Sequence, residues 1–264
     1  MQAAARQRPV GELLREWRDR RRISQLDLAI SADVSTRHLS FVETGRSRPS
    51  RELVLHLAEH LDVPLRDRNE LLAAAGFAPL YRQSTLDDPG LTSVRAAIDV
   101  ILANHAPFPA FVIDGGWQLL DANDAITAFL PLIDPALTEP PLNIIRASLH
   151  PDGLSRWIVN FGEYAAHVIE RLRRQLAATS DPSLAALLDE VSAYPAVADA
   201  LRGAPTAGPL AAVLPMHFRL PDSTELRFFS TMTVFGSPLD ITIAELAIES
   251  FFPADEATAA FFHA

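Results

Sequence analysis

Polar and cationic side chains gather within the first fifty residues at a spacing suited to nucleic acid. Thr36, Arg37 and His38 are consecutive and open an amphipathic segment, and Arg46 and Arg48 follow it. Side chains in the first turn of a helix can reach base edges in the major groove, where arginine pairs bidentately with guanine. Arginines in the loop after such a helix are suited to phosphate contacts. These residues indicate recognition of double-stranded DNA, with an ordinary solvated helix face as the alternative.

Two short helices and a tight turn must position these side chains. Ser24 and Ser35 are favourable N-cap residues for the two helices, and Gly45 suits the C′ position that ends the second. Asp33 stands at the turn, where it tolerates a left-handed backbone better than most residues. The stretch 23–49 therefore predicts a helix-turn-helix. Its inward apolar face is formed by Leu28, Ala29, Val34, Leu39 and Val42.

The pattern over residues 8–79 resembles the XRE-type, phage-repressor-like DNA-binding domain of five helices. The resemblance rests on Gln25, Leu28, Ala29, Val34, Ser35, Leu39, Glu43, Gly45 and Pro49. Asp33 departs from the pattern, because glycine is usual at that turn. The resemblance implies that Gln25 clamps a phosphate and that the helix opening after Ser35 reads base edges. The DNA-binding set is thus expected to be Gln25, Ser35, Thr36, Arg37, His38, Ser40, Arg46 and Arg48.

Charge divides the chain into two parts. All 23 basic residues are arginine; residues 1–79 carry a net charge of +2 and residues 80–264 carry −12. Only the N-terminal part is therefore suited to approach a polyanion, and the acidic remainder disfavours diffuse binding to DNA. Arg20, Arg21 and Arg22 suit either the C-terminal end of a helix dipole or the phosphate backbone. The absence of lysine indicates a GC-rich bacterial genome.

Length and composition restrict the class of protein. The 264 residues, 48% of them hydrophobic, suit two domains with sizeable cores. Cysteine is absent, which excludes disulfides, thiolate nucleophiles and cysteine-ligated metals. The sequence has no apolar leader and no stretch of membrane-spanning length, so we expect a cytoplasmic protein without membrane contact.

Enzyme motifs are missing from the sequence. It has no G-x-S-x-G, no phosphate-binding P-loop and no dinucleotide fingerprint. His56 and His60 stand four residues apart on either side of Glu59, but a solvated helix face is favoured over a metal site. We therefore expect neither catalysis, nor a metal, nor a cofactor other than a bound fatty acid acting as an effector.

The predicted organisation is a DNA-binding domain over 1–79, a linker over 80–90 and a second domain over 91–264. In the second domain we expect a cap at Asn123 and an α+β fold. Its predicted helices cover 91–104, 125–130, 142–149, 155–178, 183–192 and 197–201. Its predicted strands cover 109–113, 117–121, 209–220, 226–234 and 241–248, with a hairpin turn at 114–116.

This order of elements resembles a PAS fold, in which an antiparallel sheet and short helices enclose a pocket. The segments 109–123, 149–174 and 226–262, following an XRE-type domain, resemble the MmyB-like regulators. The resemblance covers nearly the whole chain. It implies a transcription factor with a PAS-like ligand-binding domain, for which a fatty acid or similar acyl compound is the leading ligand.

The candidate ligand-binding residues are mostly apolar, with one cation for an acidic head group. That cation is Arg146; His150, Arg156 and Arg227 also lie near apolar runs. The set is Phe111, Ile113, Leu119, Ile126, Phe129, Leu130, Ile145, Arg146, Trp157, Phe161, Phe228 and Met232. Plain core packing is the alternative for each apolar residue, because a sequence does not reveal a void.

Three functions remain open from the sequence. The favoured one is a regulator that binds operator DNA and senses a small apolar ligand. The second is a DNA-binding regulator whose C-terminal domain is a ligand-free dimerisation or partner-docking module. The third is an enzyme or sensor domain that carries a redox or haem cofactor. We expect a homodimer on DNA, because one helix-turn-helix reads only a few base pairs.

Overall fold

A computed structural model describes residues 8–203, 215–236 and 238–263 of the chain. The chain divides into two compact units. One comprises Met1–Ser84 with Pro238–Ala244, and the other comprises Thr85–Ser237 with Glu245–Ala264. The first division, after Ser84, falls inside the expected linker, and the segment 238–244 joins the N-terminal unit although it is distant in sequence.

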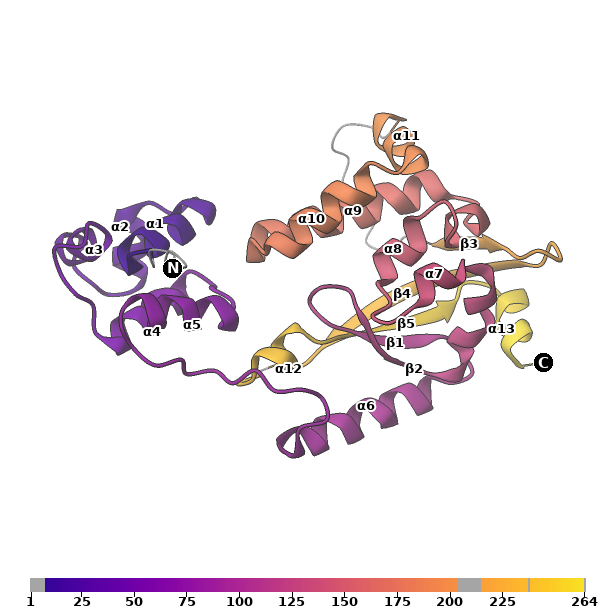
Figure 1. Ribbon diagram of the computed structural model, residues 1–264, viewed down its shortest axis with the longest axis horizontal. Helices are drawn as coiled ribbons and strands as arrows, with labels where there is room; N and C mark the ends of the chain where they lie inside the picture. The colour runs from indigo at the N-terminus through magenta and orange to yellow at the C-terminus, as the bar shows by residue number, and fades with distance from the viewer. Residues whose placement is uncertain (1–7, 204–214, 237, 264) are drawn as a thin grey trace, which may run out of the picture. The chain divides into compact units, whose positions relative to one another are not determined.

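Residues 8–84 of the N-terminal unit form five short helices (Figure 1): α1 (Val10–Arg20), α2 (Gln25–Ser31), α3 (Thr36–Glu43), α4 (Arg51–His60) and α5 (Leu65–Ala74). Ser24 caps α2 and Ser35 caps α3, as their types predict, and each accepts a hydrogen bond from a backbone N–H of the first turn. Asp33 adopts a left-handed φ of 49° at the turn, and Gly45 has a φ of 72° after α3.

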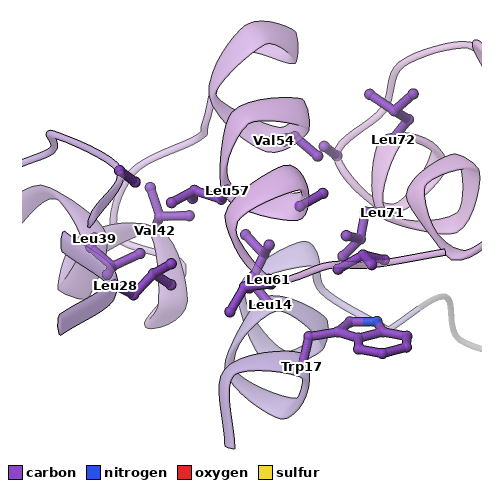
Figure 2. Packing of buried hydrophobic residues seen from close by; sticks show 14 of the residues in the cluster. Leu14, Trp17, Leu28, Leu39, Val42, Val54, Leu57, Leu61, Leu71 and Leu72 are labelled. Atoms are coloured by element: carbon purple, nitrogen blue, oxygen red, sulfur yellow. The ribbon is translucent and has the colours of Figure 1, made fainter. Parts of the chain in front are cut away.

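The core of this unit is a continuous apolar cluster between the helices. Figure 2 shows the labelled side chains converging there, among them Leu14 and Trp17 of α1, Leu39 of α3 and Leu57 of α4. Gly11 lets α1 approach the end of α3, since a Cβ at that position would lie 2.3 Å from the carbonyl oxygen of Val42. Such a core holds α3 firmly against α1 and leaves its outer face to solvent.

A segment from the connection between the last two strands packs against residues 82–84. Ser84 Oγ donates to Asp240 Oδ2 at 2.7 Å, and the N–H of Ile241 donates to the carbonyl of Arg82 at 2.8 Å. Asp240 also accepts from the N–H of Thr242 at 2.8 Å and so begins a short helix, α12 (Ile241–Glu245). The predicted strand over 241–248 is therefore wrong in its first half, because Asp240 caps a helix there.

The C-terminal unit contains an antiparallel sheet of five strands in the order β2-β1-β5-β4-β3 (Figure 1). The strands are β1 (Ala110–Ile113), β2 (Leu119–Ala122), β3 (Met216–Arg219), β4 (Glu225–Val234) and β5 (Ala247–Pro253). Two strands, a helical region and three further strands are the predicted α+β, PAS-like layout, which is thereby confirmed. Of the predicted strand over 209–220, residues 209–214 lie outside the described part of the chain.

Helices cover both faces of this sheet. Ile98 and Leu102 of α6 (Thr92–His105) pack against Val112 on one face, whereas Phe111 on the opposite face packs with α9 (Phe161–Thr179). This alternation along β1 follows from the two-residue period of a strand. The remaining helices are α7 (Pro135–Thr138), α8 (Ile144–Leu149), α10 (Pro182–Ser192), α11 (Pro195–Gly203), α13 (Glu256–His263) and the 3-10 turns η1 (Pro89–Leu91), η2 (Asp124–Ala128), η3 (Leu130–Leu132) and η4 (Leu154–Trp157).

Two local predictions in this unit need correction. The long helix expected from residue 155 begins only at Phe161, because a 3-10 turn and an extended Ile158, which bridges to Phe218 of β3, come first. Asn123 does not cap η2 with its side chain. Its amide instead accepts from the N–H of Ala110 at 3.1 Å and donates to the carbonyl of Phe108 at 2.8 Å, which fixes the start of β1.

Among the described residues, none of the helices combines the length and the apolar character needed to cross a bilayer.

Candidate functional site

The outer face of α3 presents the side chains expected to read bases. Thr36, Arg37 and His38 are exposed, while Leu39 directly after them is buried. Ser35 Oγ accepts from the N–H of His38 at 3.1 Å, so it is committed to capping the helix. The guanidinium of Arg37 lies 5.3 Å from the ring centre of Phe41. This turn offers hydrogen-bond donors to a groove while the rest of the helix is anchored.

Gln25 belongs to a polar network around a buried carboxylate. Its Nε2 donates to Glu43 Oε2 at 3.0 Å, and Arg18 donates to both carboxylate oxygens of Glu43 at 2.8 and 3.1 Å. Arg15 adds a contact at 3.3 Å. Burial opposes the ionisation of Glu43, but these hydrogen bonds outweigh it and hold the pKa of the carboxyl below its ordinary value. The network fixes Gln25 at the start of α2.

The remaining expected DNA contacts have differing surroundings. Arg46 is exposed beside Phe41, 5.9 Å from the ring centre, and is suited to a phosphate contact. Arg48 donates to the carbonyl of Ala75 at 3.1 Å and so also stabilises the end of α5. Ser40 is half-buried on the flank of α3.

The pair of histidines on α4 has structural contacts. His56 Nε2 lies 2.8 Å from the carbonyl oxygen of Ala32, and its ring packs edge-on against that of His60 at 4.6 Å. No group of three or more potential metal ligands occurs anywhere in the described ranges.

The C-terminal unit contains a cavity of about 280 Å³, partly open to solvent, between its sheet and the helices α8 and α9. Its walls are largely apolar. Eight of the expected ligand-binding residues line it: Phe111, Leu119, Ile126, Phe129, Leu130, Ile145, Phe228 and Met232. The structure thus brings together residues from β1, β2, β4, α8 and the 3-10 turns that are far apart in sequence.

Four expected residues lie elsewhere. Ile113 is part of the packed core, and Trp157 and Phe161 belong to an adjacent apolar cluster. Arg146 points away from the cavity and forms two hydrogen bonds of 2.7 Å with Glu190, which lower the pKa of that carboxyl. The expectation for Arg146 is therefore corrected: one residue along a helix turns the side chain by about 100°, so Ile145 faces inward and Arg146 outward.

A different set of polar residues lines the cavity, and the sequence reasoning missed it. Tyr164, His167 and Arg171 recur at helical spacing on α9, and Glu249 comes from β5. Two signals were present in the sequence. One was the i, i+3, i+7 spacing on α9, and the other was a charged residue in the strand AIESFFP, whose remaining residues are apolar except for Ser250.

The polar lining has distinct electrostatics. Burial raises the pKa of Glu249 and raises that of Tyr164 to about 12. Burial also lowers the pKa of His167, and the charges of Arg171 and Arg174 act in the same direction. Near neutral pH, Tyr164 and His167 are thus uncharged, and Arg171 is the cation of this set.

Comparison with known families agrees with both parts of this description. The model of the MmyB-like transcription regulator ligand binding domain matches residues 94–264, and a helix-turn-helix domain model matches residues 9–71. Neither is an enzyme family. A comparison with curated proteins found no match.

Proposed function

Because the chain belongs to the family of MmyB-like transcription regulators, we propose that its cavity binds a long apolar molecule with an acidic head, a fatty acid or related acyl compound. The protein is a DNA-binding transcription regulator with a ligand-binding domain. The proposal adds the chemical class of the ligand to that description.

The observation that carries this proposal is the composition of the cavity wall. Aromatic and aliphatic side chains make up most of it, and a cation, Arg171, lies among its few polar groups. Burial of a methylene contributes about 0.8 kcal/mol, so a chain of a dozen methylenes gains enough to outweigh the entropy lost on binding. A guanidinium is also a favourable partner for a carboxylate.

On DNA, we propose that two copies bind a pseudo-palindrome with half-sites about one helical turn apart. The proposal is supported by the position of the exposed side chains Thr36, Arg37 and His38, which lie in the first turn of α3, where one copy would reach only a few base pairs. Thr36, Arg37 and His38 are the proposed base readers, while Gln25, Arg46 and Arg48 are the proposed phosphate contacts.

Native mass spectrometry of the purified protein, before and after denaturation, tests the ligand proposal. We expect an added mass in the native spectrum that is released on denaturation and is identified as a fatty acid by extraction. Delipidated protein should then gain thermal stability on addition of dodecanoic acid. Absence of both a bound mass and a thermal shift would favour a ligand-free dimerisation module, and the same spectra report the oligomeric state.

A further inference from the structure

The polar groups of the cavity include a buried acid next to a cation. Glu249 is 7% exposed and lines the cavity together with Arg171. Its Oε1 accepts a hydrogen bond from Ser230 Oγ at 2.7 Å. The shortest distance between Arg171 and this carboxylate, from Nη1 to Oε1, is 3.8 Å. A direct charge-assisted hydrogen bond is about 1 Å shorter, so the ion pair is loose.

Arg171 is held in place by an aromatic ring. Its guanidinium carbon lies 4.6 Å from the ring centre of Trp117, whose indole N–H donates to Gln175 at 2.7 Å. The arginine side chain retains 26% of its exposure. A guanidinium offers five donors, which is enough to serve both Glu249 and a ligand oxygen.

An acidic ligand at Arg171 would place a second carboxylate close to Glu249. Two carboxylates that share a buried site do not both stay ionised; one of them takes a proton. We propose that the acid head of the ligand binds between Arg171 and a protonated Glu249, so that binding is coupled to uptake of one proton. This inference rests on the proposed function.

The groups that face Glu249 support this assignment. Arg171 and Tyr164 of α9 and Ser230 of β4 interact with it, and Met232 on β4 and Phe111 on β1 are its cross-strand neighbours. His167 of α9 lines the same cavity. Arg171 stays charged, and Tyr164 keeps its proton because its pKa is about 12. Burial raises the pKa of Glu249 but lowers that of His167. With its Oε1 atom 3.8 Å from Arg171 Nη1, Glu249 is the acid beside the proposed position of the head group and is the proposed acceptor of the proton. Once protonated, it donates a hydrogen bond to the head group.

The coupling also defines the ligand class. A chain with a carboxylic acid head should be bound more tightly as the pH falls, because the complex holds one more proton than its separated parts. A chain with an uncharged hydroxyl head adds no negative charge, so its affinity should not follow the titration of Glu249 in this way.

Calorimetric titration of the delipidated full-length protein with dodecanoate and with dodecan-1-ol tests the coupling. We expect dodecanoate affinity to fall with rising pH, approaching tenfold per pH unit where Glu249 is ionised in the free protein. Titrations in buffers with different ionisation enthalpies should then report uptake of close to one proton. Dodecan-1-ol should show a much flatter profile.

Three variants test the site, and the first of them assigns the proton. Glu249→Gln keeps a hydrogen-bond donor and is always neutral, so it should flatten the pH profile for dodecanoate. Glu190→Gln removes the surface partner of Arg146 and should keep the wild-type profile. Arg171→Gln should lower the affinity for dodecanoate at least tenfold more than the affinity for dodecan-1-ol.

The proposal is overturned if dodecanoate binds to the wild-type protein without proton uptake at every pH tested, including pH values at which Glu249 is ionised in the free protein. It is also overturned if the pH profile persists in Glu249→Gln and disappears in His167→Gln. The wild-type buffer comparison decides the matter even if a variant fails to fold. Failure of both dodecanoate and dodecan-1-ol to bind at any pH would instead reject the proposed function, and this inference with it.

Discussion

Each unit of the protein buries a glutamate, and the two residues differ in what surrounds them. Glu43 is 4% exposed and receives hydrogen bonds from Arg18, Arg15 and Gln25. Glu249 is 7% exposed, with Ser230 as a close partner and Arg171 further away. The pKa of Glu43 is lowered, whereas that of Glu249 is raised. Burial alone therefore does not decide the role of an acid; its partners do.

The same contrast extends to the cores. The helical unit packs its apolar side chains into a continuous cluster (Figure 2), whereas the sheet unit leaves a cavity beside its core. In a close-packed core, added volume displaces neighbouring side chains and lowers stability, whereas a core with a cavity can accept an added group. In this protein the solid core orients α3, and the hollow core carries the proposed ligand site.

The largest expected effect is from Glu43→Ala. Removal of this carboxylate leaves Arg18 and its neighbours without their buried partner, which typically costs about 3–5 kcal/mol. Native-state hydrogen exchange of the α1–α5 amides measures the loss. The control is Glu16→Ala, which breaks a more exposed pairing with Arg8 and Arg20 and should cost at most about 1 kcal/mol. Equal losses for the two variants would contradict the structural role of Glu43.

Substitution by a larger side chain should destabilise the two cores to different extents. Leu57→Trp in the solid core should destabilise the helical unit by about 1–3 kcal/mol. Leu119→Trp, which faces the cavity, should cost less than about 1 kcal/mol and lower the amount of extracted lipid. Leu120→Trp on the exposed side of β2 is the control and should leave lipid unchanged. A large loss of stability at Leu119→Trp with no lipid in either protein would indicate a filled core.

Changes in the reading surface should affect DNA and leave the ligand site alone. Arg37→Ala should weaken binding to a selected operator by about 1–3 kcal/mol and relax the preference at one base pair. Operator selection followed by titration measures both, and dodecanoate affinity is the internal control. Full operator discrimination by this variant would remove Arg37 from the reading residues.

A smaller and more uniform effect is expected for Arg46→Ala. Loss of one phosphate contact should weaken binding to all DNA sequences alike. It should also reduce the slope of log affinity against log salt concentration by about one unit. Titrations at several salt concentrations with operator and unrelated duplexes measure it. A change confined to the operator would place Arg46 on a base instead.

The two acids should also give opposite pH trends in stability. The folded pKa of Glu43 is depressed, so its contribution is present above the unfolded pKa and is lost as the pH falls through the folded value. The folded pKa of Glu249 is raised, so the sheet unit loses stability as the pH rises through that value. Above the folded pKa of Glu249, hydrogen exchange of the delipidated protein should show that Glu249→Gln stabilises the sheet unit. An absence of that gain would indicate that Glu249 is ionised at little cost.

Local chemistry in the sequence determined the helix-turn-helix. The caps at Ser24 and Ser35, the left-handed turn at Asp33 and the C′ glycine at Gly45 each act within a few residues. Their effect can therefore be predicted without a tertiary structure. The strand pattern of the second unit followed in the same way, although Asp240 turned the expected start of the last strand into a helix.

The cavity and its polar groups were decided only by the tertiary structure. A void is a property of many side chains that fail to fill a space, and eight expected residues lined it while Ile113, Trp157 and Phe161 packed beside it. The arginine that lines the cavity is Arg171 and not the expected Arg146, because the orientation of α8 turns Arg146 toward Glu190. Arg171 and Glu249 stand 78 positions apart in the sequence, and only the packing of α9 over β5 brings their charges within 3.8 Å.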